Sequence, residues 1–434
     1  MLYWIYSKWT SRQPIEVFPV PVAGLSTGIL QDSQEHIALK CLRDLIHIGG
    51  GGSWPPTATY DSWPPALSAY NSVFRTLEEA LPVEEASLDN TRNREIIDSF
   101  RARMRSQLDR SIAIEDVEVT LEAWKSQKDC SAHAAWLGFF ACISFLRHAY
   151  RWGVTPIVSE AQNETFLTFP RALELPWIAI QHRFGITSPS GCMTSICYSN
   201  MASADHLQYS VTVGMPDEHR STEFWNTKLV CDMEAKVLPA YHLFAQAIRF
   251  VDLELPESAR DALKMANETL KAALKYFFKT MVDSNISHAV WMAYVQGFQG
   301  WALNGTDGIS GGQSLVFRTL DAFLGIRPWP THEKERLHIP EIQRNWINCL
   351  RDYDIRAVSR ERGYDEVTAE LDSLVKQLRV WRMGHMRRMQ PYESVHRPER
   401  LHMTAGISVV NASNENQMIE HLKKELGRRL AQTL

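Results

Sequence analysis

Apolar residues recur along this chain with the spacing that is typical of amphipathic α-helices. In the segment Val367–Tyr392 they fall three or four residues apart, which places them along one face of a helix. His385 fills the one gap in this apolar stripe, and Pro391 ends the segment. From the helix alone, a core histidine that hydrogen-bonds a neighbour is the commoner interpretation, and a ligand is the alternative.

Similar patterns predict helices over most of the chain after residue 36. Residues 133–152 are apolar on nearly every face, which is typical of a helix buried in a core. Prolines in residues 1–35 indicate an extended arm, and residues 185–220 have no clear pattern. No useful length of strand alternation occurs, so the sequence predicts an all-α fold. The predicted helices are 36–48, 66–81, 93–110, 115–127, 133–152, 222–247, 257–282, 286–298, 314–324, 339–350, 367–392 and 415–430.

Composition and charge favour a small-molecule partner in the cytoplasm. The formal net charge of -4 provides no basic field for nucleic acid or an anionic membrane. The 7 cysteines are scattered without CxxC spacing, which favours a reducing compartment over a disulfide framework or a zinc site. The first residues do not form a convincing signal peptide, and no membrane-spanning run is evident. We therefore expect a cytoplasmic protein, and a monomer.

The predicted helix 314–324 carries a carboxylate on its apolar face. Asp321 lies in the same stripe as Phe317, Leu320 and Leu324. A buried carboxylate is costly unless it is paired, so the pattern predicts a nearby cation. Arg318, one turn back, is the local candidate. Arg382 is the alternative, and that pair would join two helices beside His385.

A glycine-rich loop, residues 304–313, precedes this helix. It lacks the Lys-Ser/Thr of a P-loop and follows no strand, so phosphate binding is not favoured. It is either a plain connector or a flexible flap over a ligand, with Ser310 as a polar contact. GxSxG and HExxH motifs are absent from the sequence. Several charged or polar positions are expected on solvated surfaces: His332, His338, Arg387, Arg388, Lys423, Lys424, Arg428 and Arg429.

Taken together, these segments resemble the indoleamine 2,3-dioxygenase family. The resemblance rests on Gly308–Ile326, Ile339–Leu350, Arg382-Met-Gly-His385, Leu173–Pro176 and, more weakly, Thr404–Ser408. It implies heme b bound between the helices of a large all-α domain, with a smaller domain above it. We expect residues 1–205 to form a small, mostly helical N-terminal domain and linker. Residues 206–434 would form the large heme-binding domain, and a chain of 434 residues favours such a division.

The same resemblance assigns roles to residues near the expected heme. His385 becomes the axial iron ligand, which leaves the sixth position open for O₂. Arg382 would bind a heme propionate and pair with Asp321. Ser310 and Gly311 would lie over the distal face. The resemblance therefore favours iron ligation by His385 over a core role.

The distal side departs from the family pattern. Asn226 and Val230 stand where a Phe and a Ser are common, and Gln181 stands where a Tyr is common. Val295 replaces the Arg that holds the substrate carboxylate, a contact typically worth about 1.5–3 kcal/mol. The sequence thus predicts a heme-dependent dioxygenase that acts on an indole or related aromatic other than free tryptophan. Alternatives are other heme chemistry on the same fold, and heme binding without turnover.

Overall fold

The computed structural model describes most of the chain after residue 35. The described residues are 36–79, 89–127, 129–153, 164–301, 303–306, 308–328, 331–388, 391, 403–404, 407–408 and 415–433. The predicted N-terminal arm lies outside these residues, and so do Met389 and Tyr392 at the end of the His385 helix. Ile37–Leu434 form one compact unit. The predicted boundary near residue 205 stays a prediction.

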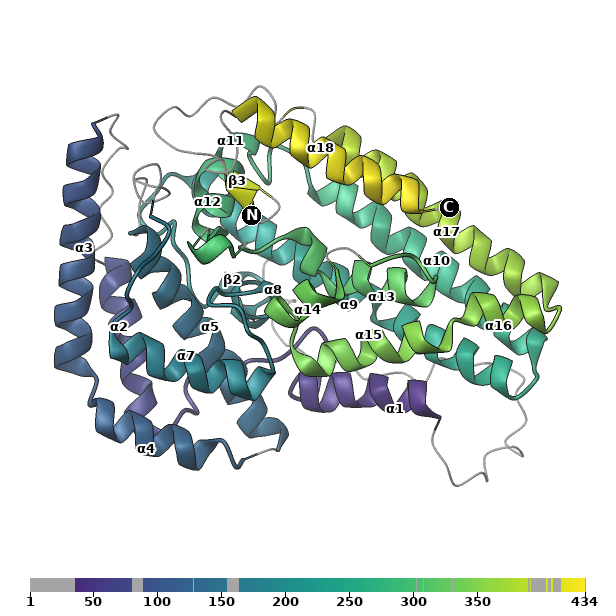
Figure 1. Ribbon diagram of the computed structural model, residues 1–434, viewed down its shortest axis with the longest axis horizontal. Helices are drawn as coiled ribbons and strands as arrows, with labels where there is room; N and C mark the ends of the chain where they lie inside the picture. The colour runs from purple at the N-terminus through teal and green to yellow at the C-terminus, as the bar shows by residue number, and fades with distance from the viewer. Residues whose placement is uncertain are drawn as a thin grey trace, which may run out of the picture. The chain divides into compact units, whose positions relative to one another are not determined.

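The described residues confirm the all-α fold (Figure 1). Their strands form two short antiparallel pairs: β1 (Met201–Ser203) with β2 (His206–Leu207), and β3 (Met403–Thr404) with β4 (Ile407–Ser408). The main helices are α1 (Ile37–Asp44), α2 (Pro65–Glu79), α3 (Asn90–Ser111), α4 (Ile114–Trp124), α5 (Cys130–Trp152), α7 (Arg171–Phe184), α9 (Asp217–Asp252), α10 (Pro256–Thr280), α13 (Leu315–Phe323), α14 (His332–His338), α15 (Glu341–Tyr353), α16 (Ile355–Glu361), α17 (Asp365–Arg388) and α18 (Glu415–Gln432). Short helical turns include α8 (Met193–Ile196), α11 (His288–Val290), the π turn η3 (Trp291–Val295) and α12 (Gln296–Gln299).

Periodicity did not predict α7, α14 and α16, and the predicted exposure of His338 is wrong. α7 contains Pro176, which obscured its pattern, and α14 and α16 are short. His338 was expected in solvent, but it is only 5% exposed at the end of α14. Burial lowers the pKa of His338 to about 4. The charged sequence of α14 concealed its contact with the interior, and the His332 side chain lies outside the described residues.

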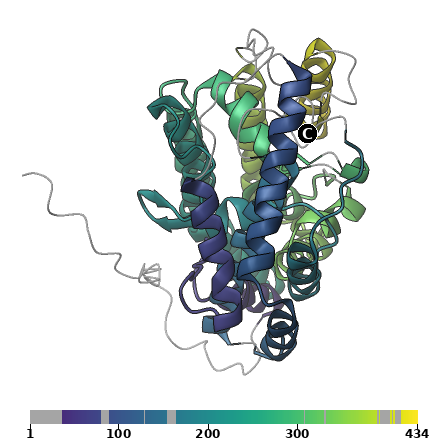
Figure 2. The ribbon, with the colours of Figure 1, turned by 90° about the vertical axis from the view of Figure 1, so that its left-hand side faces the viewer.

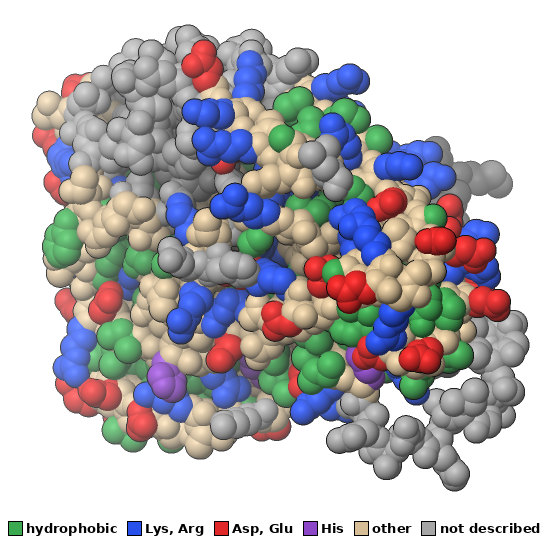
Figure 3. Space-filling model, turned by 45° about the vertical axis from the view of Figure 1, so that its right-hand side comes forward, with side chains coloured by type: hydrophobic (Ala, Val, Ile, Leu, Met, Phe, Trp, Pro, Cys, Tyr) green, Lys and Arg blue, Asp and Glu red, His purple; other side chains and the backbone are tan. Residues whose placement is uncertain are grey.

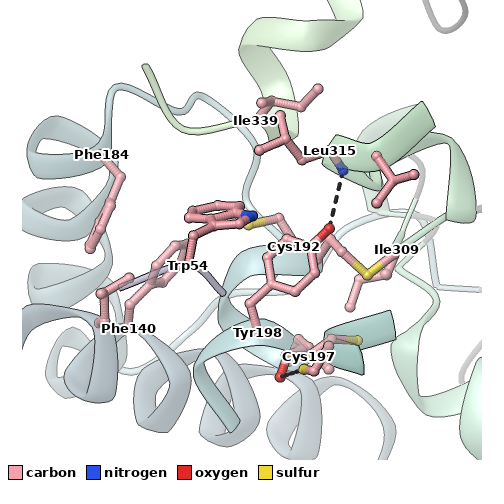
Figure 4. Packing of buried hydrophobic residues seen from close by; sticks show 14 of the residues in the cluster. Trp54, Phe140, Phe184, Cys192, Cys197, Tyr198, Ile309, Leu315 and Ile339 are labelled. Carbon is pink, nitrogen blue, oxygen red and sulfur yellow. Dashed lines mark hydrogen bonds between the residues drawn. The ribbon is translucent and has the colours of Figure 1, made fainter. Parts of the chain in front are cut away.

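α5 packs against α2, α3 and α7, and the purple α2 and blue α3 lie in front in Figure 2. Every residue from Ala132 to Trp152 is buried, which confirms the predicted core helix. α5 is long and apolar enough to span a membrane by length and composition, but 83% of its apolar window is buried inside the protein. Phe140 stacks on Phe184 of α7 with ring centroids 4.6 Å apart (Figure 4). These features indicate the core helix of a globular fold.

α9, α10 and α17 pack together (Figure 1). α10 turns back along α9 after the short connection at Leu253–Leu255. Gly384 allows α17 to approach α10 closely, because a Cβ at this position would lie 2.7 Å from the ring of Phe278. α18 runs beside α17, and α1 packs beneath α15.

A fully buried carboxylate joins distant parts of this core. Glu234 of α9 accepts hydrogen bonds from Trp54 Nε1 at 2.9 Å, Tyr198 OH at 2.7 Å and Tyr241 OH at 2.9 Å. It also accepts one from the backbone N–H of Val316 at 3.0 Å, in the first turn of α13. Burial raises the pKa of Glu234, and these donors oppose that effect. Glu234 therefore fixes the start of α13.

Tyr198 links Glu234 to a second backbone N–H group at the start of α13. Its hydroxyl donates to Glu234 and accepts a hydrogen bond from the N–H of Leu315 at 3.1 Å (Figure 4). The first backbone donors of a helix have no partner within the helix, so these two side chains satisfy part of the α13 N-terminus. The position of α13 matters because this helix carries Phe317 and Asp321.

We expect Glu234→Ala to lower the free energy of unfolding by about 3 kcal/mol or more, because each buried donor left without an acceptor costs about 1–3 kcal/mol. Chemical denaturation of the variant and the parent protein measures this loss. Glu218→Ala is the control, since Glu218 is an exposed residue of the same helix. A loss below about 1 kcal/mol in Glu234→Ala would contradict the structural role assigned to this carboxylate.

Candidate functional site

A large cavity lies between α9, α12, the glycine loop, α13, α17 and α18. Its volume is about 1410 Å³ when its open mouth is included. Seven of the nine residues singled out in the sequence line it: Asn226, Val230, Ser310, Gly311, Asp321, Arg382 and His385. Segments far apart in the sequence therefore meet around one space, which is the usual form of a small-molecule site.

The other two predicted residues do not line this cavity. Gln181 lies on α7, where its Nε2 donates to the carbonyl oxygens of Thr187 and Ser188 at 3.1 and 2.9 Å. Val295 ends the π turn η3 and is 2% exposed, without reaching the cavity wall. The structure thus brings the predicted proximal residues together and separates Gln181 and Val295 from the site.

Sequence reasoning missed several residues of the wall. Met193 and Cys197 come from the segment 185–220, which had no periodic pattern to interpret. Gln296 and Gln299 come from α12, which directly follows Val295. Arg429 comes from the last helix. Its neighbours in sequence are charged, and this charge run had indicated only a solvated surface.

His385 is half-buried in the cavity wall on α17. Its ring stacks on Trp381, with ring centroids 5.0 Å apart and planes 11° apart. The ring of Phe277 is nearly perpendicular to it, with ring centroids 5.7 Å apart. Among the residues that the structure describes, none forms a hydrogen bond with this ring. Burial lowers the pKa of His385 to about 4, so the imidazole is neutral at pH 7. Histidine ligates metals in this neutral form, through a ring nitrogen whose lone pair does not accept a hydrogen bond.

The buried ion pair predicted between Asp321 and Arg382 is confirmed. Arg382 Nη2 lies 2.6 Å from Asp321 Oδ1, and both residues are buried. Arg429 of α18 binds the other carboxylate oxygen, which corrects the prediction that Arg429 lies on a solvated face. Arg318, the local candidate, forms its salt bridge with Glu335 of α14 instead. One carboxylate therefore joins α13, α17 and α18 at the cavity.

Hydrogen bonds hold the glycine loop against the cavity. Gln296 Nε2 donates to the carbonyl of Ile309 at 3.0 Å, and the Ile309 N–H donates to the carbonyl of Gln299 at 3.1 Å. Gln313 Nε2 donates to the carbonyl of Gly308 at 3.0 Å. Gly308 has no room for a side chain, since a Cβ would lie 2.5 Å from the Gln299 carbonyl oxygen. These contacts anchor the part of the loop that precedes Ser310.

Ser310 and Gly311 follow in the same wall. Ser310 Oγ accepts a hydrogen bond from the N–H of Gly312 at 3.2 Å, so its hydroxyl proton remains available as a donor. Gly311 faces open space, because a Cβ at this position would meet no heavy atom within 4 Å. The loop thus presents a hydroxyl and an uncovered backbone to the cavity.

His148 connects two segments that carry cavity residues. Its Nε2 accepts a hydrogen bond from the N–H of Gly191 at 3.0 Å, just before Met193. Its Nδ1 lies 2.8 Å from the carbonyl oxygen of Phe298, just before Gln299. A donor on one side and an acceptor on the other fix the neutral tautomer with the proton on Nδ1. Burial is the largest influence on its pKa and lowers it to about 4.

Comparisons with known proteins provide no relative for this chain. No protein-family profile matches it, and no curated protein is significantly similar to it. Within the described part of the chain, no cluster of three or more His, Cys, Asp or Glu side chains could hold a bare metal ion. The cavity and its residues are therefore the features that indicate a function.

We expect Asp321→Ala to lower the free energy of unfolding by about 3–5 kcal/mol, because removing one partner leaves buried guanidinium groups without a counter-charge. Chemical denaturation measures the change. Asp109→Ala, an exposed position on α3, provides the control and should change stability by less than about 0.5 kcal/mol. Equal stability of Asp321→Ala and the parent protein would show that the ion pairs do not hold the three helices.

Acid should destabilise the fold between pH 6.5 and 4, because His148 has a folded-state pKa of about 4 against 6.5 as its ordinary value. In this window the unfolded chain binds more protons than the folded protein, so the free energy of unfolding falls as pH falls. Each such group contributes at most about 1.4 kcal/mol per pH unit. Denaturation at a series of pH values measures the slope.

The variant His148→Gln should show a shallower slope than the parent protein over this range. Other buried histidines, such as His338, keep part of the pH dependence in both proteins. His206→Gln changes an exposed histidine and should leave the slope unchanged. If His148→Gln retains the full slope of the parent protein, His148 is not held neutral by its two backbone partners.

Proposed function

We propose that this protein is a heme-dependent oxygenase of the indoleamine 2,3-dioxygenase type, which inserts O₂ into an indole or related aromatic compound. The observation that carries the proposal is His385. Its neutral imidazole lies in the wall of a large cavity, stacked on Trp381 and without a hydrogen bond from any described residue. The resemblance found in the sequence supports the same assignment.

The residues around His385 fit heme b better than a bare metal ion. One neutral nitrogen donor surrounded by aromatic and aliphatic side chains suits a porphyrin, which supplies the other four nitrogen ligands itself. An aromatic layer next to His385 consists of Trp381, Phe317 and Phe277. The rings of Phe317 and Trp381 stack with their centroids 4.1 Å apart. Arg382 and Arg429 lie in the same wall, where they would hold the propionates.

When bound, the heme would supply the oxygen chemistry, and the chain would supply binding and orientation. Other apolar residues of the wall, including Val230, Met193 and Ile309, would orient a flat aromatic ring and exclude water from it. Ser310 would offer its hydroxyl proton to a polar atom of the ligand. Val295 lies outside the cavity wall, so the choice of a substrate other than free tryptophan does not rest on this residue.

The charge distribution supports a small-molecule substrate over nucleic acid or a membrane as the partner. Acidic and basic side chains are interspersed over the face shown in Figure 3, and the formal net charge is -4. The proposal therefore comprises a monomeric cytoplasmic enzyme that acts on a small aromatic compound and O₂.

The absorption spectrum of the purified protein tests heme binding. We expect a Soret band that shifts on reduction, and loss of this band in His385→Ala because this variant lacks the imidazole that would ligate the iron. His206→Ala, at an exposed position, is the matched control and should retain the band. A His385→Ala protein with the full heme content and spectrum of the parent protein would overturn the assignment of the axial ligand.

Turnover separates the proposed reaction from its alternatives. After anaerobic reduction, O₂ is added with a panel of indoles, and product mass shows how many oxygen atoms were inserted. Turnover without O₂ would identify a different heme reaction on the same fold. A protein that binds heme but consumes none of the indoles would be a heme-binding protein without the proposed activity.

A further inference from the structure

Polar side chains that α9 and α12 contribute to the cavity wall are amides. Asn226 comes from α9, and Gln296 and Gln299 come from α12. The charged side chains of the wall come from α13, α17 and α18. The elements around the cavity therefore differ in the ligand groups that they can bind.

Gln299 is the side-chain amide of this group to which no described side chain or backbone group is hydrogen-bonded. It lines the cavity and is 6% exposed, and no described residue forms a hydrogen bond with its side chain. Its backbone is fixed by the hydrogen bond from Ile309, so the side chain starts from a defined position. The Gln299 side chain lines the cavity, so a ligand there can accept a hydrogen bond from its N–H group and donate one to its C=O group.

The two neighbouring amides have orientations that their partners fix. Asn226 Oδ1 accepts a hydrogen bond from Trp291 Nε1 at 2.8 Å, and an indole N–H can only donate. Gln296 Nε2 donates to the Ile309 carbonyl at 3.0 Å, and a carbonyl can only accept. Asn226 therefore keeps its N–H donors for a ligand, and Gln296 keeps its Oε1 acceptor. Together with Gln299 they offer donors and acceptors without net charge.

A ligand carboxylate would find the arginines of the described wall already paired. Arg382 and Arg429 both bind Asp321, and Arg318 binds Glu335. A further anion would have to share Arg382 and Arg429 with Asp321 and with the proposed propionates, so it would gain little from them. The neutral amides are therefore better partners for an uncharged ligand than for a free amino acid.

We propose that Gln299 determines ligand specificity, and that the cavity selects an uncharged aromatic compound that carries a secondary amide or lactam. This inference rests on the proposed function, because it places the ligand in the cavity that His385 also lines. The amide C=O of the ligand accepts from Asn226 or Gln299, and its N–H donates to Gln299 or Gln296. Free tryptophan, a zwitterion, has neither the charge nor the hydrogen-bonding pattern of this surface.

Isothermal titration calorimetry with N-acetyltryptamine and L-tryptophan tests the inference on the purified full-length protein. We expect N-acetyltryptamine to bind at least about tenfold more tightly than L-tryptophan, and Gln299→Leu to weaken N-acetyltryptamine binding by about tenfold. Gln377→Leu changes a half-buried amide of α17 outside the cavity and should leave both affinities unchanged. Gln299→Glu, of nearly the same size, provides the test if the leucine variant does not fold.

Three results would overturn the inference: tighter binding of L-tryptophan, unchanged affinity in the Gln299 variants, or no binding of N-acetyltryptamine by heme-loaded protein. The Soret band is recorded on the same samples. Protein without heme that still prefers N-acetyltryptamine, and loses this preference in Gln299→Leu, contradicts the proposed oxygenase function while supporting the role of Gln299. Protein with a normal Soret band and no preference contradicts the role of Gln299 alone.

Discussion

The interaction on which the site depends is the sharing of one buried carboxylate by two arginines. Asp321 of α13 binds Arg382 of α17 through one oxygen and Arg429 of α18 through the other. A single buried charge is strongly unfavourable, so none of the three helices can move away without exposing an uncompensated group. Arg382 lies one turn before His385 on α17. The same ion pairs that stabilise the helices therefore also fix the position of the imidazole in the cavity wall.

The rest of the wall is fixed by buried polar groups in the same way. Glu234 and Tyr198 bind the first backbone donors of α13, and His148 binds the segments that lead to Met193 and to Gln299. Apolar packing is tolerant of small shifts, whereas hydrogen bonds in a buried site have narrow geometric limits. A cavity built on such bonds keeps its shape without a ligand, which lowers the entropic cost of binding one.

The sequence was informative where a property is local, and uninformative where it depends on distant partners. Apolar spacing predicted α5 and α17, and the rule that a buried carboxylate needs a cation led from Asp321 to Arg382. Arg429 and His338 were misplaced because charged neighbours suggested solvent, while their burial follows from contacts with α13 and the interior. Met193 was missed because its segment has no periodicity, and its place in the wall arises from tertiary structure alone.

The separation of charged and neutral groups within one cavity explains how it could hold two ligands of different chemistry. A heme has an anionic edge, and the arginines of α17 and α18 lie in the same wall as His385, where the proposed propionates need positive charge. An organic substrate that also carried an anion would compete for those arginines. A wall of amides, contributed by α9 and α12, binds an uncharged substrate without such competition. Replacing a charged substrate anchor by neutral amides would therefore change which aromatic compounds enter the cavity while leaving the interactions around His385 intact.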